Sequence, residues 1–299
     1  MNRPLTVIGL GDSICYGIGD LGADWLGPSW VGRFAHSVQA DRLVNLATPG
    51  QRAADVARIQ LPAALALGPS IALLSVGGND LLRADFNPVS LWQHTTTVVA
   101  DLAAAGATVL VLGLPQTHAH DFLPAPVRRA MNERADLVNT ALLGAVRAAT
   151  VRLRLANGAL GYYIDLWNDP NAANPGHWHI DRMHPSPSGH DYLARIACEV
   201  TRLHRTGSAL PTDGASAKPP ATWWLLRHGT PWLLRRSVDL IPQAMVSLAF
   251  HKRQYQRMRH RLHTAIEADL GRHGIADRPP STTNSCPVMN EEASLAKNT

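Results

Sequence analysis

The chain has 299 residues, of which 45% are hydrophobic, and its three cysteines are Cys15, Cys198 and Cys286. This length allows one large domain or a domain of about 200 residues with an extension. Three irregularly spaced cysteines argue against a disulfide scaffold and against a zinc site, and they indicate a reducing compartment. The N-terminus lacks a secretory pattern and no apolar run reaches membrane-spanning length, so we expect a cytoplasmic protein.

Short aliphatic runs alternate with longer segments of helical periodicity. The runs predict strands over residues 5–10, 42–46, 71–76, 108–112 and 162–166. The periodic segments predict helices over residues 30–39, 52–67, 89–105, 127–150 and 188–203, with Pro62 able to split the second. Strands separated by helices of this length predict a parallel sheet covered on both faces.

The formal charge is unevenly distributed along the chain. Residues 1–220 contain 17 basic and 17 acidic residues, residues 221–274 contain 9 and 3, and residues 275–299 contain 2 and 3. Composition divides the chain into a domain over 1–206, a flexible linker over 207–222, a basic helical extension over 223–274 and a disordered tail over 275–299. The basic excess therefore lies in one C-terminal block, which needs its own explanation.

The first buried strand ends at Gly11, and Ser13 follows two residues later. A serine hydroxyl becomes a good nucleophile only when a base removes its proton. That base is commonly a histidine oriented by a carboxylate, and Asp181 and His184 offer both groups on one loop. A tight turn would bring Asp181 to Nδ1 of His184 and leave Nε2 facing Ser13.

A tetrahedral intermediate at Ser13 would also need hydrogen-bond donors for its oxyanion. The backbone amides of Ser13 and Gly50 and the side-chain amide of Asn79 are the candidates. Each follows a predicted strand, and the carboxyl ends of parallel strands meet at one edge of a sheet. We therefore expect Ser13, Gly50, Asn79, Asp181 and His184 to lie together.

Four blocks of the sequence resemble those of the SGNH (GDSL-type) hydrolases. They are residues 11–14 (GDSI), 45–50 (NLATPG), 77–80 (GGND) and 181–186 (DRMHPS), and the resemblance covers residues 5–205. It implies a flavodoxin-like three-layer α/β/α fold with five parallel strands, no metal or cofactor, and ester or thioester hydrolysis through an acyl-enzyme. It makes Ser13 the nucleophile, His184 the base, Asp181 its partner, and Ser13, Gly50 and Asn79 the oxyanion hole.

Several neighbouring residues invite a chemical role but are better explained as structural. We expect Asp12 and Asp80 to bind backbone amides, His190 to pack or face solvent, and Cys15 to pack. Asn45 is equally suited to anchoring loops and to chemistry. The pairs His118/His120 and His177/His179 have a metal-ligand spacing, but no acidic or cysteine partner completes either pair.

The basic block over 223–274 contains Trp223, Trp224 and Trp232 and then a helical stripe of apolar residues. The stripe is formed by Tyr255, Met258, Leu262, Ile266 and Leu270. One interpretation places this block against the hydrolase domain or a second copy. The other places it at an anionic membrane surface, such as the inner face of the membrane. No nucleic-acid-binding module is visible. Parts of this block resemble extensions found on some actinobacterial GDSL-type proteins.

The sequence therefore predicts a serine hydrolase that cleaves carboxylic esters of small molecules or lipids. We expect the substrate pocket to be built by the loops over residues 16–29, 82–88 and 115–126. Acyl transfer or thioester hydrolysis at the same site is the alternative chemistry. A catalytically idle, membrane-associated binding protein is the alternative from a different class.

Overall fold

The computed structural model describes residues 4–20, 27–116, 125–154, 161–179, 181–203 and 253–273. The strands are β1 (Thr6–Gly11), β2 (Arg42–Asn45), β3 (Ile71–Ser75), β4 (Thr108–Leu112) and β5 (Gly161–Ile164). The helices are α1 (Ser13–Tyr16), α2 (Ser29–Ser37), α3 (Ala53–Asp55), the π-helical η2 (Val56–Gln60), α4 (Leu61–Leu67), α5 (Gly78–Leu81), α6 (Pro88–Ala104), α7 (Ala125–Arg154), the 3₁₀-helix η4 (Pro175–His177) and α8 (Pro187–Thr201). All five predicted strands are confirmed.

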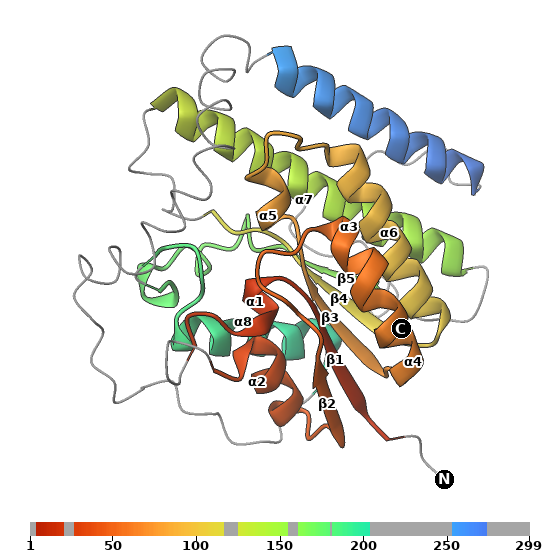
Figure 1. Cartoon of the computed structure of the whole chain (residues 1–299), viewed down its shortest axis with the longest axis vertical. Coiled ribbons are helices and arrows are strands. Elements are labelled where there is room, and N and C mark those ends of the chain that lie inside the picture. Colours follow the sequence, from red (N-terminus) through yellow and green to blue (C-terminus); the bar gives the residue numbers. More distant parts are fainter. Residues whose placement is uncertain are drawn as a thin grey trace, which may run out of the picture.

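The five strands form one parallel sheet in the order β2-β1-β3-β4-β5. Helices α2 and α8 cover one face, and α3, η2, α4, α6 and α7 cover the other (Figure 1). This is the flavodoxin-like three-layer fold that the sequence predicts. Because the strand order reverses between β1 and β3, the carboxyl ends of these two strands border a crevice suited to a ligand.

The two faces of the sheet are filled by alternate residues of the same strands. On β3, Ile71 and Leu73 pack towards α2 and α8, whereas Ala72 and Leu74 pack towards α6 and α7. Neighbouring side chains of a strand point to opposite faces, so a central strand buried on both sides must be apolar throughout. This explains why β1, β3 and β4 are uniformly hydrophobic runs in the sequence.

Pro62 does not end the helical segment that begins at Ala53. A π-helical turn over Val56–Gln60 precedes it, in which the Leu61 amide donates to the carbonyl of Val56. Proline has no amide hydrogen and its ring crowds the preceding turn, so a wider turn lets the helix continue. The predicted split at Pro62 is therefore replaced by a local change of helical register.

A further helix over residues 253–272 lies beside α7 (Figure 1). Its side chain Leu262 is fully buried, and Ile266 is 9% exposed and covers Gly144 of α7. A Cβ at Gly144 would approach Ile266 Cδ1 to 2.5 Å, so a larger residue there would displace the Ile266 side chain. The predicted apolar stripe is therefore used for packing within the chain rather than facing a membrane.

Polar contacts fix the direction of this helix along α7. Tyr255 Oη donates to Asp136 Oδ2 over 2.7 Å, and Arg152 Nη2 donates to both carboxylate oxygens of Asp269 over 2.8 and 3.0 Å. Tyr255 near the start of this helix contacts Asp136 of α7, and Asp269 near its end contacts Arg152, which lies later in α7. The two helices therefore run parallel. No helix among the described residues has the length and apolarity to cross a bilayer.

The remaining predictions for the C-terminal third fall on parts of the chain that the structure does not describe. These are the linker over 207–222, the tryptophans Trp223, Trp224 and Trp232, and the tail over 275–299.

Candidate active site

The candidate nucleophile stands just beyond the end of the inner strand β1. Gly11 has a φ of +125°, and a Cβ there would lie 1.9 Å from the Ser75 carbonyl oxygen, so only glycine fits. Asp12 caps α1 by accepting the Ile14 amide, and Ser13 is the first residue of that helix. The turn thus presents the Ser13 hydroxyl beyond the carboxyl edge of the sheet.

A side chain from the π-helical turn fixes the backbone just before Ser13. Gln60 is buried, and its Oε1 accepts the Gly11 amide over 2.7 Å while its Nε2 donates to the Gly11 carbonyl over 2.9 Å. These two hydrogen bonds engage both the backbone N–H and the backbone C=O of Gly11, which lies next to the candidate site. Nothing in the sequence pattern predicts this role of Gln60, although π-helical turns occur frequently at functional sites.

Asp181 and His184 lie on a tight loop that leads into α8. Asp181 Oδ1 accepts the amides of Met183 and His184, and Asp181 Oδ2 lies 2.6 Å from His184 Nδ1. The opposite ring nitrogen, His184 Nε2, lies 2.9 Å from Ser13 Oγ. The loop thus has the geometry predicted from the three-residue spacing.

The charges of this pair reinforce each other. Burial alone would raise the pKa of Asp181, but the charge of His184, the nearby His179 ring and hydrogen bonds from His184 hold that pKa well below its usual range. Burial alone would lower the pKa of His184, but the charge and hydrogen bond of Asp181 outweigh it and raise the pKa. Asp181 is therefore ionised at neutral pH, and His184 is a stronger base than an ordinary histidine.

Asp12 is a second carboxylate close to this pair. Burial raises its pKa to about 6, although the Ile14 amide and the Ser75 hydroxyl, which donate to Oδ1 over 3.1 and 3.2 Å, favour the ionised form. Its charge also contributes to the raised pKa of His184. The amide contact agrees with the structural role predicted for Asp12, and the structure adds an electrostatic one.

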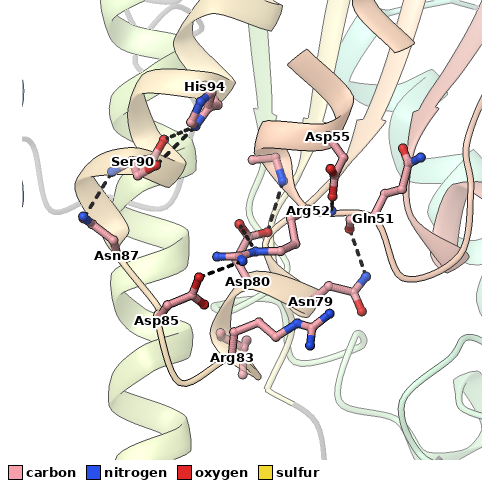
Figure 2. A network of polar contacts seen from close by, with 12 residues as sticks. Gln51, Arg52, Asp55, Asn79, Asp80, Arg83, Asp85, Asn87, Ser90 and His94 are labelled. Atoms are coloured by element: carbon pink, nitrogen blue, oxygen red, sulfur yellow. Dashed lines mark hydrogen bonds and ion pairs between the residues drawn. The ribbon is translucent and has the colours of Figure 1, made fainter. Parts of the chain in front are cut away.

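Gly50 and Asn79 border the same cavity as Ser13 and His184. Gly50 has a φ of +84° with open space where a Cβ would stand. The Asn79 side-chain nitrogen donates one hydrogen to the Gln51 carbonyl over 3.1 Å (Figure 2). Because a carboxamide nitrogen carries two hydrogens, this bond orients the group and leaves a second hydrogen to donate.

The cavity has a volume of about 640 Å³ and reaches from the candidate nucleophile to α7. Ile18, Arg83 and Pro115, which line it, come from the three loops predicted to build the pocket. The wall also includes residues outside those loops, namely Leu114, Ala135, Trp178 and Met183. Residues 21–26 and 117–124, and with them His118 and His120, lie outside the described residues.

Other residues singled out in the sequence have structural partners. Asn45 Nδ2 donates to the Cys15 carbonyl over 2.7 Å, and Asp80 Oδ2 accepts the Ala53 amide over 3.2 Å. His190 is buried and accepts the Trp30 amide at Nδ1, and its burial lowers its pKa to about 4. Cys15 is fully buried, which raises the pKa of its thiol. Asn45 therefore anchors loops, and His190 packs inside the fold.

His179 belongs to the candidate site in a way that the sequence did not reveal. It is 2% exposed, and its Nδ1 lies 3.6 Å from Asp181 Oδ2. His177 instead stacks on the Tyr192 ring at 4.5 Å. Among the described residues, no group of three or more histidine, cysteine or acidic side chains could hold a metal ion.

Comparison with known proteins identifies a family model that this chain matches. The model of the GDSL-like Lipase/Acylhydrolase family matches residues 10–192. No curated protein is significantly similar to this chain.

Solved structures share the fold. A lipase/acylhydrolase from Enterococcus faecalis is 17% identical, with a TM-score of 0.52 over 68% of this chain and 99% of that one. LAE5, an alpha/beta hydrolase from the metagenome of Lake Arreo, Spain, is 20% identical, with a TM-score of 0.50 over 66% of this chain and 95% of that one. At these identities the likeness concerns the fold alone. The family match spans more than half of the chain, and we conclude that the protein belongs to the GDSL-like lipase/acylhydrolase family.

Proposed function

We propose that the protein is a serine hydrolase that cleaves carboxylic esters. The observation that carries this proposal is the continuous hydrogen-bonded series from Asp181 through His184 to Ser13 at the wall of the cavity. His184 Nε2 takes the proton of Ser13 Oγ as this oxygen attacks the ester carbonyl carbon. Asp181 holds the ring and stabilises the imidazolium that forms.

The negative charge that develops on the carbonyl oxygen needs donors in place before the reaction. The amides of Ser13 and Gly50 and the side chain of Asn79 are the proposed donors, since all three residues line the cavity. When the tetrahedral intermediate collapses, His184 returns the proton to the leaving alcohol and an acyl-Ser13 remains. Water then attacks the acyl-enzyme with His184 again as the base, which releases the acid and regenerates Ser13.

Hydrolysis of short p-nitrophenyl esters tests the assignment. We expect Ser13→Ala and His184→Ala each to reduce kcat by at least about 10⁴-fold while the circular dichroism spectrum stays unchanged. Arg58→Ala, at an exposed position of the π-helical turn, is the matched control and should retain full activity. Activity that survives in Ser13→Ala would overturn the proposal. Product analysis with added alcohols distinguishes hydrolysis from acyl transfer.

We also propose a peripheral contact with anionic membranes through the outward face of the helix over 253–272. Arg253, Arg257 and Arg261 are exposed on this face, opposite the buried Leu262 and Ile266. The contact would be electrostatic, because the apolar stripe is already packed. We expect sedimentation with phosphatidylglycerol vesicles, loss of it at high salt, and loss of it in the triple arginine-to-glutamine variant. Equal sedimentation with phosphatidylcholine vesicles contradicts this proposal.

A further inference from the structure

We propose that Gln60 is a positioning residue for the oxyanion hole, because its buried carboxamide joins the segments that carry all three proposed donors. The inference rests on the proposed function, since it takes the amides of Ser13 and Gly50 and the side chain of Asn79 as those donors. Gln60 itself is not among the residues that line the cavity. It therefore acts on the reaction through other residues and does not touch the substrate.

Gln60 is buried at a position where an apolar side chain would be the simpler choice. It is 3% exposed, whereas its apolar neighbour Ile59 is 48% exposed. A buried carboxamide costs free energy unless its polar atoms are hydrogen-bonded. Here Oε1 of Gln60 accepts one hydrogen bond and Nε2 donates two, so both polar atoms have partners. These hydrogen bonds explain why the polar residue of the π-helical turn points inwards and the apolar one outwards.

The first segment that Gln60 binds leads to Ser13. The Gly11 amide donates to Gln60 Oε1 over 2.7 Å, and the Gly11 carbonyl accepts from Gln60 Nε2 over 2.9 Å. The next amide, that of Asp12, donates to the Ser75 carbonyl over 3.1 Å. The backbone that ends in the Ser13 amide is therefore fixed by Gln60 and by strand β3.

The second segment is the turn that carries Gly50. At the start of this turn, the Thr48 amide donates to the Gly11 carbonyl over 3.0 Å. The Gln51 amide closes the turn by donating to the Thr48 carbonyl over 3.3 Å. At the end of the turn, Gln51 Oε1 accepts the second hydrogen of Gln60 Nε2. Gly11 and Gln60 thus hold the two ends of the turn, and this sets the direction of the Gly50 amide between them.

The third donor is connected through the backbone of Gln51. The Gln51 carbonyl accepts a hydrogen from the Asn79 carboxamide over 3.1 Å (Figure 2). A displacement of Gln51 would therefore turn the Asn79 side chain and move its second hydrogen. An oxyanion hole works through donors that are in place before the charge develops. Displaced donors therefore reduce the stabilisation of the transition state more than they reduce the binding of the ester.

Steady-state hydrolysis of p-nitrophenyl butyrate by Gln60→Met tests the inference. Methionine has a similar length but cannot form these hydrogen bonds, so kcat should fall by about tenfold to hundredfold while KM stays within about twofold. The acid limb of the pH profile should stay in place, because the pair of Asp181 and His184 is not changed. Arg58→Met, at an exposed position of the same turn, is the matched control and should behave as wild type. An unchanged kcat in Gln60→Met overturns the inference.

A double-mutant cycle with Asn79→Ala separates positioning from a general loss of structure. Because Gln60 acts partly through Asn79, Gln60→Met should cost at least about threefold less in kcat/KM in the Asn79→Ala background than in the wild type. Equal costs in both backgrounds overturn the inference. Gln51→Ala removes the link to Gln60 at a partly exposed position, and the same cycle with this variant decides the case if Gln60→Met does not fold. If the wild type shows no Ser13-dependent hydrolysis of any ester, the proposed function itself fails.

Discussion

Asp12 is buried beside Ser13, and its charge reaches His184. Removing that charge in Asp12→Asn should lower the pKa of His184. Since His184 must be neutral to accept a proton, the acid limb of the kcat/KM profile should then move to lower pH. The measurement is the pH profile of wild type and variant with one neutral ester. Asp101→Asn on the exposed surface of α6 should leave the limb in place.

Burial of the Asp12 side chain makes the free energy of unfolding depend on pH. The folded-state pKa of Asp12 is about 6, against an ordinary value of 3.8. The folded state therefore binds the Asp12 proton more tightly than the unfolded state does, and this proton binding stabilises the fold. The stabilisation is complete below about pH 4 and is lost as the pH rises through 6. Between pH 4 and 8 the wild type should lose about 3 kcal/mol relative to Asp12→Asn in urea unfolding. Parallel stability curves for the two proteins would contradict this.

His179 acts on the site through Asp181 rather than by touching the reacting atoms. His179→Ala removes a ring nitrogen that lies 3.6 Å from Asp181 Oδ2 and helps to keep the pKa of this carboxyl group low. This contact is longer than a hydrogen bond and therefore weaker, so kcat should fall by roughly threefold to tenfold. KM should stay within about twofold, because the substrate does not meet this ring.

The control for this prediction is the neighbouring histidine. His177→Ala removes a ring that stacks on Tyr192, so kcat should be unchanged. His179→Asn restores a donor and should recover part of the lost rate. An unchanged kcat in His179→Ala would show that Asp181 does not depend on His179.

At the scale of elements, the helix over 253–272 completes the outer layer of the fold. Leu262 is fully buried and belongs to the same core cluster as residues of α6 and α7. Leu262→Ala should lower the free energy of unfolding by about 2–5 kcal/mol in urea titrations, since it leaves a cavity. Thr264→Ala on the exposed face of the same helix should change it by no more than about 0.5 kcal/mol. Similar values for the two variants would mean that this helix does not stabilise the domain.

The π-helical turn shows how an element and a residue depend on each other. Pro62 interrupts regular hydrogen bonding, and the wider turn before it carries Gln60, which binds both polar groups of Gly11. The helix and its proline were visible in the sequence. The Gln60 contact was not, because it joins residues 49 positions apart and depends on a change of register that periodicity does not encode.

For the whole molecule, the strands and their parallel arrangement were predictable because doubly buried strands must be apolar and helices must separate them. The grouping of Ser13, Gly50, Asn79, Asp181 and His184 was predictable because each stands beyond the carboxyl end of a strand. The contact between His179 and Asp181 was not, since it depends on how a loop folds. The apolar stripe over 255–270 fitted a membrane and a core equally well, and only tertiary packing distinguishes the two.

The central claim is that His184 activates Ser13 as a nucleophile. Mass spectrometry of the protein after treatment with a fluorophosphonate tests it most directly, because this reagent phosphonylates activated serines. We expect one adduct, located on Ser13, in the wild type, and none in Ser13→Ala or His184→Ala. An adduct on another residue, or ester hydrolysis that continues without any adduct, would contradict the claim.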